Sequence, residues 1–310
     1  MMHIPVLLEE AVYHLNCQPG KEIVDCTVGQ GGHSRKILES IGPKGFLWGI
    51  DRDEKVLELA EKNLAGFNNY RLINGNFGNL ENIAKRYFPQ GIDGVLFDLG
   101  VSSLQLDEAG RGFSYQKDTP LDMRMDTGQE ITARSLVNQL PLEELTRIIK
   151  EYGEESWAKR IARFIVKERE KKELKTTGEL VEVIKAAVPA RARRKGGHPA
   201  RRTFQALRIA VNKELENLKR GLEASFQILR PGGRLCVISF HSLEDRMVKE
   251  FFKSKEGKCI CPPKAPLCIC GQRKEIKIIN RKPVTPKKEE IEQNPRARSA
   301  RLRAGEKLTS

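Results

Sequence analysis

The sequence predicts an α/β fold in which a parallel sheet is combined with an inserted all-helical domain. Apolar, strand-like runs alternate with helical patterns over residues 22–100, which is typical of β-α-β units. Over residues 112–199 the patterns are helical, and a strand-like run returns at 235–240. We therefore expect the sheet domain to be discontinuous in sequence, because the helical region interrupts it.

The helical patterns are clearest in the middle of the chain. Three segments have apolar residues at helical spacing: 141–152, 157–169 and 176–188. The last of these begins with Thr176 and Glu179 at the spacing of a capping box and ends before Pro189. Apolar residues then step mostly by three or four over 207–229, which predicts one long amphipathic helix that leads back into the sheet.

The order of these elements predicts the domain boundaries. We expect a sheet domain that binds a cofactor at 1–112 and 205–310, and an inserted helical domain that recognises the substrate at 113–204. The Pro-rich, charged stretch at 277–295 is typical of an extended segment, and it gives the sheet domain a basic C-terminal tail.

A glycine loop follows the first strand-like run. This loop includes Gly29, Gly31 and Gly32, and the next strand-like run ends in Asp51. A glycine loop between a strand and a helix lets the backbone approach a ligand, and an acid about 20 residues further on can bind two ribose hydroxyls. Ser34 stands where a dinucleotide-binding loop has its third glycine, so the pattern suits the smaller nucleoside cofactor S-adenosylmethionine (SAM) better than NAD.

Three further segments place functional residue types at strand ends. A short run ends near Phe77, a buried-strand run ends in Asp98, and the run at 235–240 follows a Pro-Gly-Gly turn. Because ligands of doubly wound sheets bind at the carboxyl ends of the strands, these ends should meet at one crevice of a Rossmann-like sheet. Phe77 would cover an adenine there or, alternatively, would be a core residue behind a turn.

Eight motifs in this order resemble the RsmH (MraW) family of ribosomal RNA small subunit methyltransferases H. The motifs are Asp25-Cys-Thr-Val-Gly-Gln-Gly-Gly-His-Ser34, Asp98-Leu-Gly-Val-Ser-Ser103, Arg111-Gly-Phe-Ser114, Pro120-Leu-Asp-Met-Arg-Met-Asp126, Tyr152-Gly-Glu-Glu155, Thr203-Phe-Gln-Ala206, Ile238-Ser-Phe-His-Ser-Leu-Glu-Asp-Arg246 and Asn294-Pro-Arg-Ala-Arg-Ser299. The resemblance implies a SAM-dependent methyltransferase with a Rossmann-like sheet. It also implies methylation of N4 of a decoding-centre cytosine in 16S rRNA, with 16S rRNA or the small ribosomal subunit as partner.

The resemblance also implies a set of cofactor-binding positions, namely Gly31, Gly32, His33, Asp51, Phe77, Asp98 and Gln105. Gln105 is included on the resemblance alone. His33 either contacts the ligand through its backbone or is a capping or core histidine.

Asp98 is the candidate catalytic residue. Methyl transfer depends mainly on alignment, and an acceptor for the amino protons of an unstacked cytosine would help N4 to attack. Ser102, Ser239 and His241 are the alternative acceptors. Asp98-Leu-Gly-Val departs from the Asn/Asp-Pro-Pro-aromatic run that many other aminomethyltransferases carry at this strand end. Methylation at carbon 5 is disfavoured, because no cysteine stands where it could attack the ring.

The charge of the chain is consistent with a nucleic-acid partner. The sequence has 55 Lys+Arg against 41 Asp+Glu, a net charge of +14. Such a surplus favours a polyanion through counterion release, although a basic surface can also serve only solubility. Two clusters favour phosphate contact: Arg191, Arg193, Arg194, Lys195, Arg201, Arg202 and Arg208, and near the C-terminus Arg296, Arg298, Arg301 and Arg303.

The seven cysteines do not suggest a disulfide framework. Four lie close together, Cys259, Cys261, Cys268 and Cys270, and either hold a structural zinc or form a reduced loop; no metal is assigned to the active site. No apolar run is long enough to cross a membrane and no signal peptide is evident, so we expect a cytoplasmic protein without membrane contact. The sequence leaves the oligomeric state open.

Two alternative functions compete with methyl transfer. A nicotinamide-dependent oxidoreductase would use the same type of sheet and Asp51, but it should have the missing third glycine. A non-enzymatic RNA-binding protein would explain the basic charge, but it would leave Asp51, Phe77 and Asp98 without a role.

Overall fold

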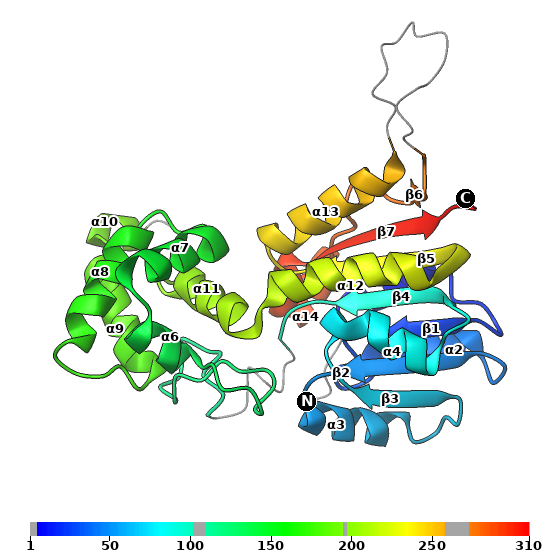
Figure 1. The fold of residues 1–310 in the computed structure, drawn as a ribbon, viewed down its shortest axis with the longest axis horizontal. Coiled ribbons are helices and arrows are strands. Elements are labelled where there is room, and N and C mark those ends of the chain that lie inside the picture. Colours follow the sequence, from blue (N-terminus) through cyan, green and yellow to red (C-terminus); the bar gives the residue numbers. More distant parts are fainter. Residues whose placement is uncertain (1–4, 102–109, 195–196, 258–272, 310) are drawn as a thin grey trace, which may run out of the picture. The chain divides into compact units, whose positions relative to one another are not determined.

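The computed structural model describes residues 5–101, 110–194, 197–257 and 273–309. The chain forms two compact units, one from 1–100 and 216–310 and the other from 101–215 (Figure 1). These divisions differ from the boundaries at 112/113 and 204/205 that the sequence suggested. At the first boundary, Arg111 donates to the carbonyls of Arg124 and Met125 and so belongs with the second unit.

The first unit contains a seven-stranded sheet in the order β3-β2-β1-β4-β5-β7-β6 (Figure 1). The strands are β1 Glu22–Asp25, β2 Phe46–Asp51, β3 Tyr70–Asn74, β4 Ile92–Asp98, β5 Leu229–Ser239, β6 Ile276–Ile278 and β7 Arg301–Lys307. Strands β1 to β5 pair in parallel, whereas β7 is antiparallel to both β5 and β6. Strand order reverses between β1 and β4, which makes this the switch point where ligands of doubly wound sheets bind.

Both faces of the sheet are buried. Along β4, Val95 and Phe97 belong to one apolar core and Leu96 belongs to another. Ile23 and Val24 of β1 divide in the same way. Because neighbouring strand residues point to opposite faces, the two cores lie on opposite sides of the sheet, as parallel sheets require.

Helices connect the strands and cover these faces. They are α1 Leu8–Leu15, α2 Gly32–Ile41, α3 Glu54–Leu64, η1 Phe77–Asn79, α4 Leu80–Tyr87, α12 Glu214–Ile228, α13 Ser242–Glu256, α14 Lys288–Gln293 and η2 Pro295–Ser299. The alternation of strands and helices over residues 22–100 confirms the α/β prediction.

The Pro-Gly-Gly segment lies inside β5 instead of forming a turn before it. Leu229 pairs with Ile92 and Arg234 pairs with Gly94, so residues 230–233 form an irregularity in the ladder. Gly232 has a φ of 79°, a value that favours glycine. The Pro-Gly-Gly segment therefore interrupts β5 locally without ending it.

The expectation of a basic C-terminal tail is wrong for Arg301 and Arg303, because these residues belong to a strand of the sheet. Nε of Arg303 lies 2.7 Å from Oδ1 of Asp245, and Nη1 of Arg301 lies 2.9 Å from Oδ2 of the same carboxylate. These guanidinium groups lower the pKa of Asp245, although its burial acts in the opposite direction. The two arginines thus fasten β7 to α13 and are already paired.

The second unit is helical and has its own apolar core. Its helices are α6 Ala133–Gln139, α7 Leu142–Gly153, α8 Ala158–Arg169, α9 Thr177–Ala187, α10 Ala190–Arg193 and α11 Arg201–Asn212. The predicted capping box at Thr176 and Glu179 is confirmed at the start of α9. No helix in the described ranges is long and apolar enough to cross a membrane.

The single long helix expected over 207–229 is instead two helices. Lys213, with a φ of 49°, separates α11 from α12. The end of α11 is fixed by Asn212, whose side chain accepts from the backbone N–H of Met125 and donates to the carbonyl of Met123. The apolar spacing continued through this break, and so it concealed the break.

Candidate active site

Three aspartates mark the carboxyl ends of neighbouring strands in the sheet unit. Asp25, Asp51 and Asp98 are the last residues of β1, β2 and β4. Since β1, β2 and β4 are parallel neighbours, these ends meet at one edge of the sheet. The edge combines several buried or half-buried carboxylates with the glycine loop that follows β1.

The glycine loop favours glycine at two positions, for two different reasons. Gly31 caps α2 with a φ of 84°, a backbone conformation that favours glycine. A Cβ on Gly32 would lie 2.4 Å from Cγ of Pro5, so a side chain there would require a shift of Pro5. Gly31 therefore permits the turn between β1 and α2, and Gly32 permits the close approach of the backbone to Pro5.

Asp51 joins the end of β2 to this loop. Its Oδ2 accepts from the backbone N–H of Gly29 at 3.0 Å, and its Oδ1 accepts from the N–H of Asp53 at 3.0 Å. Burial raises the pKa of Asp51, and these two hydrogen bonds oppose that effect. Each carboxylate oxygen can accept a further hydrogen bond, so Asp51 has the capacity to bind a pair of hydroxyls.

Asp25 has a structural role that sequence reasoning missed. It is fully buried, and it accepts from the hydroxyl of Ser34 at 2.7 Å and from the backbone N–H of Thr27 at 3.1 Å. Burial raises the pKa of Asp25 to about 6. Ser34, which replaces the third glycine of a dinucleotide loop, thus fastens the start of α2 to the end of β1.

Asp98 lies against His33. Oδ2 of Asp98 is 3.5 Å from Nδ1 of His33, and Nε2 of His33 is 3.0 Å from the carbonyl oxygen of Val6. Oδ1 of Asp98 is buried and has no hydrogen-bond partner in the described part of the chain. Burial raises the pKa of Asp98 well above its ordinary value, and the nearby carboxylates of Asp25 and Glu244 raise it further. Asp98 is therefore suited to take up a proton.

Phe77 begins η1 at the end of the third β-α unit. Its ring packs edge-on against Phe97 with centroids 5.3 Å apart, and the residue is half-buried beside one of the two sheet cores. Part of the Phe77 ring therefore packs in the core, in agreement with the second of the two roles that the sequence left open. Contact with an adenine stays a prediction.

The two alternative acceptors that the structure describes have structural partners. The hydroxyl of Ser239 donates to the carbonyl of Arg301 at 3.2 Å. His241 caps α13 in a capping box with Glu244, whose N–H donates to Nδ1 of His241 at 3.3 Å. Nδ1 thus acts as the acceptor, so Nε2 carries the proton and faces Oε1 of Glu244 at 3.1 Å. These contacts favour Asp98 over Ser239 and His241 as the acceptor.

Several predicted positions fall outside the residues that the structure describes. They are Ser102, Gln105, Lys195, Cys259, Cys261, Cys268 and Cys270. The cofactor role of Gln105 and the zinc site stay predictions. The sequence also suggests that Cys17, Cys26 and Cys236 are small core residues; Cys26 and Cys236 are buried, whereas Cys17 is only half-buried.

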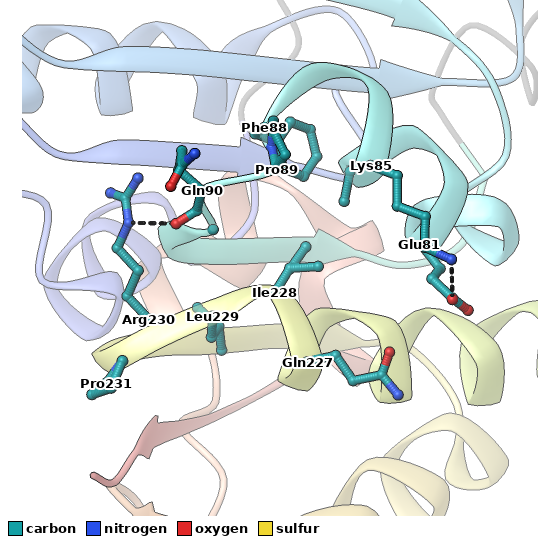
Figure 2. Close-up of a pocket in the computed structure, with 12 residues that line it drawn as sticks. Glu81, Lys85, Phe88, Pro89, Gln90, Gln227, Ile228, Leu229, Arg230 and Pro231 are labelled. Atoms are coloured by element: carbon teal, nitrogen blue, oxygen red, sulfur yellow. Dashed lines mark hydrogen bonds and ion pairs between the residues drawn. The ribbon is translucent and has the colours of Figure 1, made fainter. Parts of the chain in front are cut away.

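A pocket of about 530 Å³ lies at the opposite edge of the same sheet (Figure 2). Its lining comes from α4 and from the segments that lead into β4 and β5, including Phe88, Pro89, Ile228 and Leu229. These segments stand at the amino ends of the strands, whereas the aspartates stand at the carboxyl ends. The pocket therefore contains none of the predicted cofactor residues.

Comparison with known proteins identifies the family. The chain matches the MraW methylase family over residues 1–308. It belongs to this family. A relative from Halothermothrix orenii, named "Ribosomal RNA small subunit methyltransferase H", is 52% identical over 306 residues that cover 99% of this chain and 98% of the relative. A relative of the same name from Symbiobacterium thermophilum is 54% identical over 307 residues, covering 99% and 96%.

Among solved structures, an rRNA methylase from Streptococcus thermophilus aligns over 100% of both chains with 11% identity and a TM-score of 0.43. The assignment rests on the family match and on the sequence relatives. Membership in the MraW methylase family confirms the resemblance inferred from the motifs, and it favours methyl transfer over an oxidoreductase or a purely RNA-binding protein.

Proposed function

We propose that this protein transfers a methyl group from SAM to N4 of a cytosine in the decoding centre of 16S rRNA. The coarser activity, SAM-dependent methylation of small-subunit ribosomal RNA, follows from membership in the MraW methylase family and from relatives 52% and 54% identical over 99% of the chain. The finer assignment includes 16S rRNA or the small subunit as substrate, and the cytoplasm as the place of action.

The residues at the carboxyl edge of the sheet fit SAM. Gly31 and Gly32 bring backbone close to a ligand, Asp51 has lone pairs for the ribose hydroxyls, and Phe77 and Gln105 complete the proposed site. When bound, SAM supplies an electrophilic methyl group on a sulfonium ion. The main task of the protein is then to orient the acceptor base and to exclude water.

The assignment of N4 as the methylated atom depends on Asp98 as the proton acceptor. The N4 lone pair of cytosine is delocalised into the ring, so an acceptor for the amino protons favours attack. Oδ1 of Asp98 is buried without a partner in the described residues, and such an atom is costly unless a ligand satisfies it. In the proposed step, N4 forms a bond to the methyl carbon, the methyl–sulfur bond breaks, and a proton of the amino group passes to Asp98.

The experiment uses a strain that lacks this gene, with the 16S rRNA analysed by mass spectrometry. The wild-type protein should restore one cytosine methylated at N4, and Asp98→Ala should fail to restore it. Glu58→Ala, which removes an exposed carboxylate on α3, serves as the control and should behave as wild type. Thermal melting followed by circular dichroism shows whether each variant is folded, because Asp98 is itself one of the proposed cofactor-binding positions.

Two outcomes would overturn the assignment. Restoration of a methyl group at carbon 5 or on a ribose hydroxyl would contradict the N4 position. Full rescue by Asp98→Ala would move the acceptor role to Ser102, Ser239 or His241.

A further inference from the structure

One face of α8 carries four exposed cations. Lys159, Arg160, Arg163 and Lys167 are all exposed, and they are spaced by one, three and four residues. Residues three and four apart lie on the same side of a helix, so the four form a continuous row, here called the α8 row. Ile161, Ala162 and Ile165 of the same helix are buried in the core of the helical unit.

The α8 row differs from the paired cations of the helical unit, because its charges are uncompensated. Four exposed or half-buried cations elsewhere in that unit each lie beside a carboxylate: Arg134 with Glu173, Lys171 with Glu168, Lys172 with Glu179, and Lys185 with Glu182. In the ranges that the structure describes, no member of the α8 row forms an ion pair. Arg160 makes a contact of another kind, with its guanidinium 5.5 Å from the ring centre of Phe164.

An exposed tryptophan stands at the N-terminal end of this row. Trp157 is the residue before α8 and is 37% exposed, and its backbone N–H donates to Oε1 of Glu155. It precedes Arg160 by three residues, so the two side chains are neighbours on the surface. Another exposed cation is close in the fold, because Arg202 donates to the carbonyl of Glu154 at 3.0 Å.

Cations in a row beside an exposed aromatic ring suit a single-stranded nucleic acid. The cations follow the phosphates, and the ring offers a face on which a base stacks. An acidic protein surface would use the cations but has no specific need for the tryptophan. The reaction itself requires an unstacked base, so RNA without a complementary strand must be held near the target.

We infer that the α8 row and Trp157 bind a single-stranded segment of the substrate RNA, with the row on the phosphates and Trp157 on a base. This inference rests on the proposed function only for the identity of the polyanion as RNA. It adds a surface that sequence analysis did not identify, since the arginine cluster considered there begins at Arg191.

The main test compares two variants of equal charge. The first replaces the α8 row by Gln, and the matched control replaces four paired cations of the same unit by Gln: Arg134, Arg147, Lys172 and Lys185. Binding of a labelled single-stranded fragment of 16S rRNA is followed by fluorescence anisotropy over a range of salt concentrations. Each lost phosphate contact to a single strand should lower the slope of log affinity against log salt concentration by about 0.7. The slope of the first variant should therefore be smaller than that of the wild type by up to about 3. Its affinity for the RNA should be at least about tenfold weaker.

The control should keep most of the wild-type slope, since its cations are already neutralised by carboxylates. A slope for the first variant equal to that of the control would overturn the inference, because it would show that net charge alone matters. Thermal melting followed by circular dichroism confirms that both variants are folded.

A second measurement addresses Trp157. The sequence has two tryptophans, so Trp48→Phe leaves Trp157 as the single fluorescent reporter. Its fluorescence should be quenched by single-stranded RNA and not by polyglutamate. Trp157→Leu should weaken RNA binding about tenfold, and Trp157→Phe should restore part of the affinity. Equal quenching by polyglutamate would instead indicate an acidic protein as partner.

Methyl transfer separates the two proposals. If the wild-type protein methylates small-subunit RNA while the α8 variant keeps full RNA affinity, the inference fails and the proposed function stands. If the wild type methylates no RNA, the proposed function fails, and the binding data test the surface alone. The expected result for the α8 variant is a raised KM for RNA with unchanged affinity for SAM.

Discussion

Nδ1 of His33 faces Oδ2 of Asp98 at 3.5 Å, across the turn that joins β1 to α2. Nε2 of the same ring lies against the carbonyl of Val6 and must donate its proton there. A neutral His33 therefore presents a lone pair to Asp98. Two acceptors repel each other, so the contact is favourable when one of the two groups carries an additional proton. Asp98 can thus hold a proton on Oδ2, while its Oδ1 has no hydrogen-bond partner in the described residues and is available to a ligand.

This arrangement predicts a pH-dependent reaction. Asp98 accepts a proton from N4 only in its ionised form, and burial raises its pKa well above the ordinary value. The rate of methyl transfer should therefore fall as the pH decreases through the raised pKa of Asp98, and it should reach a plateau above that pKa. Single-turnover rates with labelled SAM at a series of pH values measure this. His33→Gln should shift the midpoint, and a flat profile for the wild type would contradict a base role for Asp98.

A separate prediction concerns Asp25 and stability. Its pKa is raised from 3.8 to about 6 in the folded protein, so the folded state binds this proton more tightly than the unfolded state does. The stabilisation is present below about pH 4 and is lost as the pH rises through about 6. At 1.36 kcal/mol per pKa unit, the change is about 3 kcal/mol.

Asp25→Asn should remove this dependence, because an amide does not ionise: its oxygen can accept from the N–H of Thr27 while its nitrogen donates to the hydroxyl oxygen of Ser34. Urea unfolding at pH 4 to 8 should show the variant gaining stability over wild type as the pH rises. Parallel curves for the two proteins would show that Asp25 does not titrate in this range.

Asp51 should determine SAM affinity. Charge-assisted hydrogen bonds to two ribose hydroxyls contribute about 1.5 to 3 kcal/mol each, so Asp51→Ala should weaken SAM binding at least about tenfold. Because Asp51 also accepts from Gly29 and Asp53, the loop itself could loosen. Asp51→Asn retains one acceptor and should give an intermediate affinity by titration calorimetry. Unchanged affinity in both variants would remove Asp51 from the site.

The arginines that sequence analysis grouped together should separate into two classes. Arg193 and Arg194 are exposed, so their replacement together with Lys195 by Ala should weaken RNA binding and lower its salt dependence without affecting SAM. Arg208 is different, because its guanidinium forms two hydrogen bonds to the carboxylate of Glu214. Arg208→Ala should lower the melting temperature. A wild-type salt slope in the triple variant would show that this cluster is only a solvated surface.

The sequence predicted the sheet and its edge because these follow from local patterns. Apolar runs ending in Asp25, Asp51 and Asp98 identify parallel strands whose ends converge, and the capping box at Thr176 is a local signal. The pairing of Asp25 with Ser34 was missed, because it depends on how α2 returns to β1. In the sequence alone, Ser34 indicates only that the third glycine of a dinucleotide-binding loop is missing.

Strand β7 was missed for a related reason. Its sequence, Arg301-Leu-Arg-Ala-Gly-Glu-Lys307, has charged residues where a buried strand should be apolar. Asp245, more than fifty positions earlier in the sequence, makes burial of Arg303 acceptable by pairing with it. A pairing over such a distance leaves no trace in the local pattern. The break at Lys213 was concealed in the same way, since Asn212 receives its partners from residues 123 and 125.

The position of β7 has a consequence for how the chain is made. Strand β5 has β4 on one side and β7 on the other, and β7 is synthesised long after β5. A chain emerging from the ribosome therefore exposes one edge of β5, with unpaired N–H and C=O groups, until residues 301–307 follow. The helical unit is continuous in sequence and can fold during this interval. The nascent protein thus passes through a stage in which its helical part is finished while its sheet still presents an open edge to other chains.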